Sequence, residues 1–309
     1  MMKKVCFIVP YFGTFPNTFE YWLQCCRNNK EFNWIIFTDD KTKYDYPENV
    51  RVMYSTLNNI KEVIEAKIGF DISLIRPYKL CDVRPLYGYI FSDYLNQFDY
   101  WGYCDLDILF GDLKVFLNDE IFEKYQKISF LGHMSLLKNC EEINQCFMKC
   151  DYRAILKNPR NRVFDEIRFS PNINELLKNS GYNILKLDNI ADIAEEPYNF
   201  ELYGIGSGNR CVKIANTPTV FRYKNNKLFK LTIEGKKIDV KEIMYVHFQK
   251  RNINVGNLKS DFLLVPNEII DDYDVTIEDI MRFSKRKLSY FIKHRCKRIR
   301  NVIKSRLIH

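Results

Sequence analysis

The stretch that decides the fold is residues 98–112, with the sequence FDYWGYCDLDILFGD. Its aromatic and aliphatic residues suit a strand buried inside a sheet. Two carboxylates, Asp105 and Asp107, interrupt this apolar run, and burying an ionised carboxylate without a partner is costly. In open α/β sheets, ligands collect at the carboxyl ends of strands. We therefore expect Asp105 and Asp107 to close a strand at a ligand site.

Oxygen ligands in an Asp-x-Asp sequence suit Mg²⁺ or Mn²⁺. These cations typically take one or two carboxylates and complete their shell with water and phosphate oxygens. The alternative is a turn at the strand end, in which the aspartates cap backbone amides. The apolar strand before Asp105 favours the metal site.

Length and composition indicate a globular α/β protein. The chain has 309 residues, of which 46% are hydrophobic, enough for one large domain or a domain with an appendage. Its ten cysteines include no Cys-x-x-Cys pair, which argues against structural zinc. The first residues lack the pattern of a secretory signal, and no 18-residue apolar stretch follows. We therefore expect a reducing cytosol.

The first forty residues predict a strand, a helix and a second strand. The apolar run 5–9 and the segment 34–40, which ends in two aspartates, suit buried parallel strands. Between them, Asn17 and Glu20 have the spacing of a capping box that would open a helix through about Arg27. This order is typical of a nucleotide-binding α/β half. No GxGxxG follows the first strand, which argues against a dinucleotide-binding Rossmann domain.

A second informative stretch is residues 243–251, IMYVHFQKR. It predicts an apolar strand that ends in an imidazole, an amide and two cations. The imidazole of His247 suits Mn²⁺ better than Mg²⁺, and Lys250 and Arg251 carry the charge that phosphate needs. The alternative is a buried, hydrogen-bonded histidine beside surface cations.

The Asp105-Leu106-Asp107 motif and the later His247 segment together resemble metal-dependent GT-A-fold glycosyltransferases, over about residues 3–255. The resemblance implies a GT-A-like single domain over residues 1–270, with a mostly parallel central sheet flanked by helices. It implies a nucleotide sugar, UDP-linked, as donor. Asp105, Asp107 and His247 would hold the metal, with Asp105 also at the donor and with Lys250 and Arg251 near the diphosphate.

The same resemblance implies further donor contacts. The loop at Tyr11 and the acid Asp39 would border the nucleoside, although Asp39 also suits a solvated turn. Lys79 and Arg84 precede a helix that Pro85 can start, and helix starts with nearby cations attract phosphate. The alternative there is a solvated helix start neutralised by its own acid, Asp82.

On the sugar and acceptor side, the resemblance implies that His133, after a predicted strand over 127–133, faces the transferred sugar. A structural histidine is the alternative. Asp165 and Glu166 resemble the acidic motif that takes the proton of the acceptor hydroxyl in inverting enzymes. A helix cap is the alternative for this pair, since reach and pKa are not visible in a sequence.

The segment 271–309 predicts a basic amphipathic helix. From Arg282 to Arg306 there are eleven Lys or Arg and no Asp or Glu, with apolar residues every three or four positions. Such a helix is typical of binding to an anionic membrane surface. Docking on a partner enzyme and binding RNA are the alternatives. The rest of the chain offers no RNA motif, so we expect no nucleic acid partner.

The resemblance implies a glycosyltransferase, and the basic segment favours a place at the inner face of the cell membrane. It would move a sugar to a glycan or lipid-linked glycan acceptor in surface polysaccharide synthesis, such as capsule or lipopolysaccharide. A DxDxT phosphatase is disfavoured because Leu109 stands where its Thr should be. A sugar-phosphate nucleotidyltransferase is disfavoured because residues 10–16 contain no Lys or Arg. A non-catalytic membrane-associated carbohydrate-binding or scaffold protein stays open.

Overall fold

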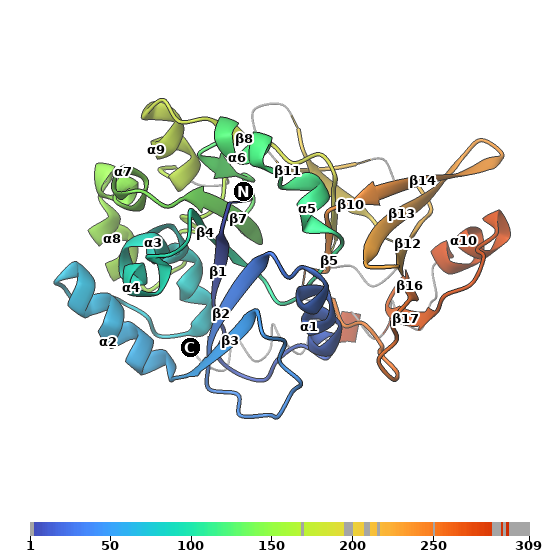
Figure 1. The fold of residues 1–309 in the computed structure, drawn as a ribbon, viewed down its shortest axis with the longest axis horizontal. Helices are drawn as coiled ribbons and strands as arrows, with labels where there is room; N and C mark the ends of the chain where they lie inside the picture. Colours follow the sequence, from blue (N-terminus) through green and yellow to red (C-terminus); the bar gives the residue numbers. More distant parts are fainter. Residues whose placement is uncertain are drawn as a thin grey trace. The chain divides into compact units, whose positions relative to one another are not determined.

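The protein is of the mixed α/β class, as predicted (Figure 1). The computed structural model describes residues 3–167, 170–194, 200–206, 211–214, 217–249, 251–285, 292 and 295–296. The chain divides into two compact units. Unit 1 comprises Met1–Leu106, Leu113–Asp188 and Gly206–Arg210, and unit 2 comprises Asp107–Asp112, Asn189–Ile205 and Cys211–His309. The division into a domain over 1–270 and a tail over 271–309 stays a prediction.

Unit 1 is built on a seven-stranded sheet with the order β3-β2-β1-β4-β7-β6-β8. The strands are β1 (Val5–Pro10), β2 (Phe32–Thr38), β3 (Val50–Tyr54), β4 (Tyr100–Cys104), β6 (Lys127–Ile128), β7 (Met134–Lys138) and β8 (Ile184–Leu185). Strands β1 to β4 pair in parallel, and so do β6 and β8. Strand β7 is antiparallel to both β4 and β6. The predicted mostly parallel sheet is thus confirmed for this unit.

Helices cover the sheet of unit 1 (Figure 1). They are α1 (Phe19–Asn28), α2 (Leu57–Ile68), α3 (Tyr87–Ile90), α4 (Ser92–Leu95), α5 (Leu113–Phe116), α6 (Asp119–Lys124), α7 (Glu141–Asn144), α8 (Tyr152–Lys157) and α9 (Ile173–Asn179), with 3₁₀ turns at Pro77–Asp82, Arg84–Leu86 and Cys146–Lys149. One core cluster joins alternate strand residues, such as Ile8, Trp101 and Tyr103, to the apolar faces of α2, α3 and α9. Side chains two residues apart on a strand share a face, so the period of two in the sequence decides this packing.

Two local predictions for unit 1 are wrong. The N-cap of α1 is Thr18, so the expected capping box starting at Asn17 is not the start of this helix. The predicted strand over 127–133 stops at Ile128, because Ser129 has a φ of 76°. Few side chains adopt that left-handed backbone conformation, and it ends the extended run.

Unit 2 contains two five-stranded sheets. The first has the order β11-β10-β9-β15-β5 and the second β14-β13-β12-β16-β17. Their strands are β5 (Ile108–Phe110), β9 (Ile190–Ile193), β10 (Leu202–Ile205), β11 (Cys211–Lys213), β12 (Thr219–Lys224), β13 (Lys227–Glu234), β14 (Lys237–Ile243), β15 (Tyr245–His247), β16 (Phe262–Val265) and β17 (Glu268–Asp271). Asn225 and Asn226 have φ angles of 52° and 64°, as a type I′ hairpin between β12 and β13 requires.

The last described helix of unit 2 is α10 (Ile277–Ser284), which opens with a capping box between Thr276 and Asp279. Most of the predicted basic helix beyond it lies outside the described residues. Among the helices that the structure does describe, each is too short or too polar to cross a bilayer.

Candidate functional site

The first cluster of functional side chains lies in unit 2, where β15 pairs with two strands that are distant in sequence. It runs antiparallel to β5, with His247 opposite Ile108, and parallel to β9, with His247 opposite Asp192. The amide of Phe248 donates to the carbonyl oxygen of Asp107, 2.9 Å away. These pairings bring Asp107, Asp192 and His247 to one place.

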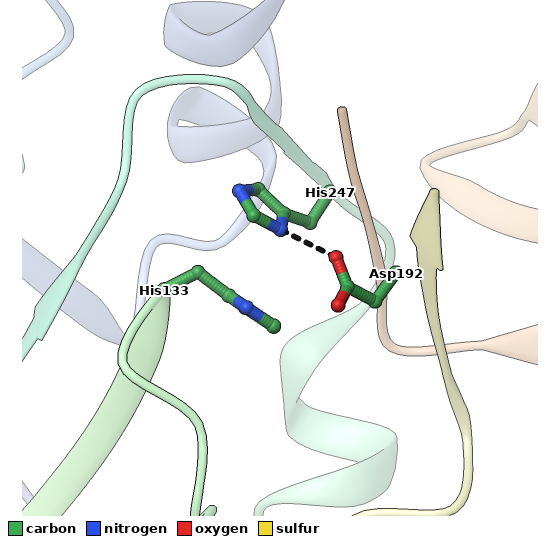
Figure 2. Close-up of side chains that lie close together, drawn as sticks. All are labelled: His133, Asp192 and His247. Carbon is green, nitrogen blue, oxygen red and sulfur yellow. Dashed lines mark hydrogen bonds and ion pairs between the residues drawn. The ribbon is translucent and has the colours of Figure 1, made fainter. Parts of the chain in front are cut away.

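The imidazole of His247 lies between two carboxylates. Its Nδ1 is 2.7 Å from Oδ1 of Asp192, a contact drawn as a dashed line in Figure 2, and its Nε2 is 3.4 Å from Oδ1 of Asp107. The amide of Gln249 donates to both oxygens of Asp192, at 2.9 and 3.0 Å. Asp192 therefore fixes the orientation of the ring, which directs Nε2 to the side of Asp107. The third side chain drawn, His133, belongs to unit 1.

Burial and charge act in opposite directions on His247. Burial lowers its pKa, but the Asp107 and Asp192 carboxylates outweigh burial and raise the pKa of His247 to about 10. Without another cation, the imidazolium is thus the positive charge that neutralises these two acids.

The donor set of this cluster fits a divalent cation. Asp107 offers a carboxylate oxygen and His247 an imidazole nitrogen, a combination that suits Mn²⁺. Metal-binding histidines usually donate their other N–H to a carboxylate that orients the ring, and Asp192 stands in that position. Sequence analysis missed Asp192. The signal was an acid within the apolar run 190–194, but its partner strand was not visible.

A second cluster lies in unit 1 around Arg84. Its guanidinium forms an ion pair with Asp105 through Nη2. Its Nη1 donates to Oδ2 of Asp165 at 3.0 Å and to the carbonyl of Gly132 at 2.7 Å. The guanidinium also lies 5.3 Å from the ring centre of Tyr103. Arg84 therefore neutralises acids from two segments that are far apart in the sequence.

Asp165 has the most perturbed carboxyl of this cluster. Its side chain is 1% exposed, and Oδ1 has no hydrogen-bond partner among the described residues. Burial raises the pKa of Asp165 to about 7, with a further contribution from Glu166, although Arg84 opposes the change. A carboxyl that titrates near neutrality is often functional.

The remaining predicted donor contacts lie elsewhere in unit 1. The hydroxyl of Tyr11 donates to the Thr14 carbonyl at 3.2 Å. The exposed Asp39 accepts from the amide of Gly13 at 2.7 Å, so it orders this loop. Lys79 is buried, and its Nζ lies 2.6 Å from Oδ2 of Asp82. The alternative of a solvated helix start is wrong for Lys79, although the pairing with Asp82 is confirmed.

The last three predicted residues have different outcomes. His133 is buried in the turn before β7, and its carbonyl accepts from the amide of Asp105 at 2.8 Å. Arg251 is also buried, with its guanidinium 5.1 Å from the ring centre of Phe200. Lys250 lies outside the described residues. The roles of all three in binding a donor stay predictions.

Fold and site together define a mixed α/β protein with a buried carboxylate–imidazole cluster at strand ends. The chain belongs to DUF6625, a family of unknown function, whose model matches residues 7–273.

No curated protein matched the chain. Among solved structures, the galactosyltransferase LgtC in complex with donor and acceptor sugar analogs is 12% identical. That match covers 61% of this chain and 75% of LgtC, with a TM-score of 0.35. An active-site mutant of LgtC is 11% identical over 61% of this chain and 74% of its own, also with a TM-score of 0.35. What this chain does must therefore be inferred from its own residues.

Proposed function

We propose that the protein is a metal-dependent glycosyltransferase that uses a nucleotide sugar, UDP-linked, as donor. The observation that carries this proposal is the cluster of Asp107, His247 and Asp192, in which two potential ligands from β-strand ends face each other at 3.4 Å and the ring is oriented by the second acid. Asp105 is two residues from Asp107 in the chain, the spacing of the Asp-x-Asp motif.

In this proposal Asp107 and His247 hold Mn²⁺ or Mg²⁺, and Asp105 assists. The bound cation would neutralise the charge that develops on the departing diphosphate. Arg251, and Lys250 beside it in the sequence, would add positive charge for the donor phosphates. Asp192 would keep His247 in the tautomer and orientation that leave Nε2 available.

We assign the proton acceptor for the incoming hydroxyl to the Asp165–Glu166 pair. A base is most effective when its pKa lies near the working pH, and the pKa of Asp165 is raised to about 7. A base that acts on the acceptor would make the reaction inverting. Arg84 lowers the pKa of Asp165 against the effect of burial, which favours the carboxylate form that a base needs.

The basic segment 282–306 is the basis for the proposed acceptor and the proposed location of the protein. Eleven cations without an acid between Arg282 and Arg306 suit an anionic membrane surface. We therefore propose a glycan or lipid-linked glycan acceptor at the cytoplasmic face of the membrane, in surface polysaccharide synthesis.

The Asp192→Asn variant should bind Mn²⁺ about 10- to 100-fold more weakly than the wild type, the usual effect of losing an outer partner of a metal-binding histidine. The amide oxygen of Asn carries no net charge, so it accepts the Nδ1–H hydrogen bond more weakly than the carboxylate does, and the ring is held less firmly. Mn²⁺ titration followed by electron paramagnetic resonance measures the change. Asp239→Ala, at an exposed position on β14, is the matched control. If Asp192→Asn bound Mn²⁺ as tightly as the wild type, Asp192 would not orient His247 for the metal.

Transfer itself is tested with radiolabelled UDP-sugars, Mn²⁺ and a bacterial membrane-lipid extract as acceptor. We expect label in the lipid fraction with the wild type, none after chelation with EDTA, and none with Asp107→Ala. Mn²⁺-dependent donor binding without release of UDP would instead indicate a non-catalytic carbohydrate-binding protein.

A further inference from the structure

A buried ion pair fastens the segment that precedes Asp165 to the 3₁₀ turn Pro77–Asp82. The ammonium of Lys79 lies 2.6 Å from Oδ2 of Asp82. It also donates to the carbonyls of Ile155 and Arg160, at 2.9 and 3.1 Å. The side chains of Lys79 and Asp82 are 1% and 0% exposed. All three protons of the ammonium thus have acceptors inside unit 1, two of them on this segment.

Asp82 holds the same segment by its backbone amides. Its Oδ1 accepts from the amides of Arg162 and Phe164, at 3.1 and 3.0 Å. Its Oδ2 also accepts from Arg162, at 2.9 Å. One carboxylate therefore accepts hydrogen bonds from the residues on both sides of Val163, the second of which directly precedes Asp165.

Val163 has a backbone conformation that its side chain disfavours. Its φ is 50°, and a β-branched residue with positive φ is a genuine outlier. Residues in such regions persist only where the surroundings enforce them, and they cluster at functional sites. The two amides held by Asp82 flank Val163, and the amide of Glu166 donates to the Val163 carbonyl at 3.1 Å, so Asp82 holds this turn together with a backbone hydrogen bond.

The enforced turn ends at a pair in the proposed site. Asp165 follows Phe164, and its Oδ2 meets Nη1 of Arg84 at 3.0 Å. Arg84 stands two residues after Asp82. The short segment 82–84 thus carries both Asp82, which binds the backbone on either side of Val163, and Arg84, which pairs with Asp165. A shift of the turn would change the approach of Asp165 to Arg84.

We propose that Asp82 is a positioning residue, which sets the Asp165 carboxylate against Arg84 by holding Val163 in a left-handed turn. The inference rests on the proposed role of the Asp165–Glu166 pair as proton acceptor. Lys79 supports it by neutralising Asp82 inside the core. A purely structural ion pair would explain the burial of Lys79 and Asp82, but not the strained residue between the two held amides.

The test follows the guanidinium signals of Arg84 by NMR of arginine-labelled protein. Removing one charge of a buried pair is strongly destabilising, so the background is the neutral pair Lys79→Met/Asp82→Leu, which also removes the Oδ1 acceptor that an Asn would keep. In this background we expect the Nη1 signals of Arg84 to lose the shift of their pair with Asp165 and to exchange with water at least tenfold faster, while the Nη2 signals keep their pair with Asp105. Adding Val163→Gly should restore the Nη1 signals, because glycine adopts positive φ without enforcement.

Two results would overturn the proposal: Arg84 signals that are unchanged in the neutral pair, or signals that Val163→Gly fails to restore. If the neutral pair does not fold, Val163→Gly alone decides. Relief of strain predicts a Tm equal to or above that of the wild type, and a fall of several degrees would refute the enforced turn. None of these measurements uses a substrate, so failure of the proposed transfer reaction would leave their outcome unaffected.

Discussion

Replacing His247 by Ala is expected to weaken Mn²⁺ binding by more than about 100-fold, since losing an outer partner alone typically costs about 10- to 100-fold. His247 offers an imidazole nitrogen, Nε2, that lies 3.4 Å from Oδ1 of Asp107. Isothermal titration of Mn²⁺ into the full chain, with UDP present, measures the effect.

The matched control is His309→Ala, which removes an imidazole at the end of the chain. We expect wild-type Mn²⁺ affinity for this control. Retention of wild-type affinity by His247→Ala would show that the cation binds elsewhere, and the cluster around β15 would then be only a buried ion-pair network.

The second large effect concerns Asp165 and pH. The carboxyl has a pKa of about 7 in the folded protein and 3.8 as its ordinary value, a difference equivalent to on the order of 4 kcal/mol. Between these two values the folded state keeps a proton that the unfolded state has released. The free energy of unfolding therefore falls as pH rises through this window. Above about pH 7 the buried charge is fully present.

Asp165→Asn keeps the side chain neutral at every pH, so it should lack this fall. Relative to wild type, the variant should gain on the order of 4 kcal/mol between pH 4 and pH 8. Urea denaturation at several pH values measures the difference, and the other carboxyls cancel because both proteins share them. Asp188→Asn, whose side chain is 79% exposed, is the control. A difference that does not change with pH would contradict the buried, raised carboxyl.

Local patterns predicted much of the fold. The apolar run 5–9 lies within β1, and most of the run 34–40 lies within β2, because the apolar pattern of each strand is contained within its own segment. The predicted strand over 127–133 failed for a local reason as well, since the positive φ of Ser129 is not encoded by hydrophobicity. Strand content is thus easier to predict than strand ends.

The candidate site was predictable only in part. Asp107 and His247 each end or border an apolar strand, and that position marked both as ligands. Asp192 was missed because its role depends on the pairing of β9 with β15, 55 residues apart at the His247 contact. The partner of Arg84 was hidden likewise, since Asp165 is 81 residues away. A contact between two segments far apart in the sequence cannot be recognised from the residue pattern of either segment alone.

The central claim is tested most directly by thermal shift with UDP, GDP and CMP, each with and without Mn²⁺, on wild type, Asp107→Ala and the control Asp239→Ala. A ligand that binds the native state raises Tm by mass action. The account predicts a Mn²⁺-dependent rise with UDP in wild type and control, and none in Asp107→Ala. No rise with any nucleotide, or an equal rise in Asp107→Ala, would contradict a metal-held nucleotide sugar at this site.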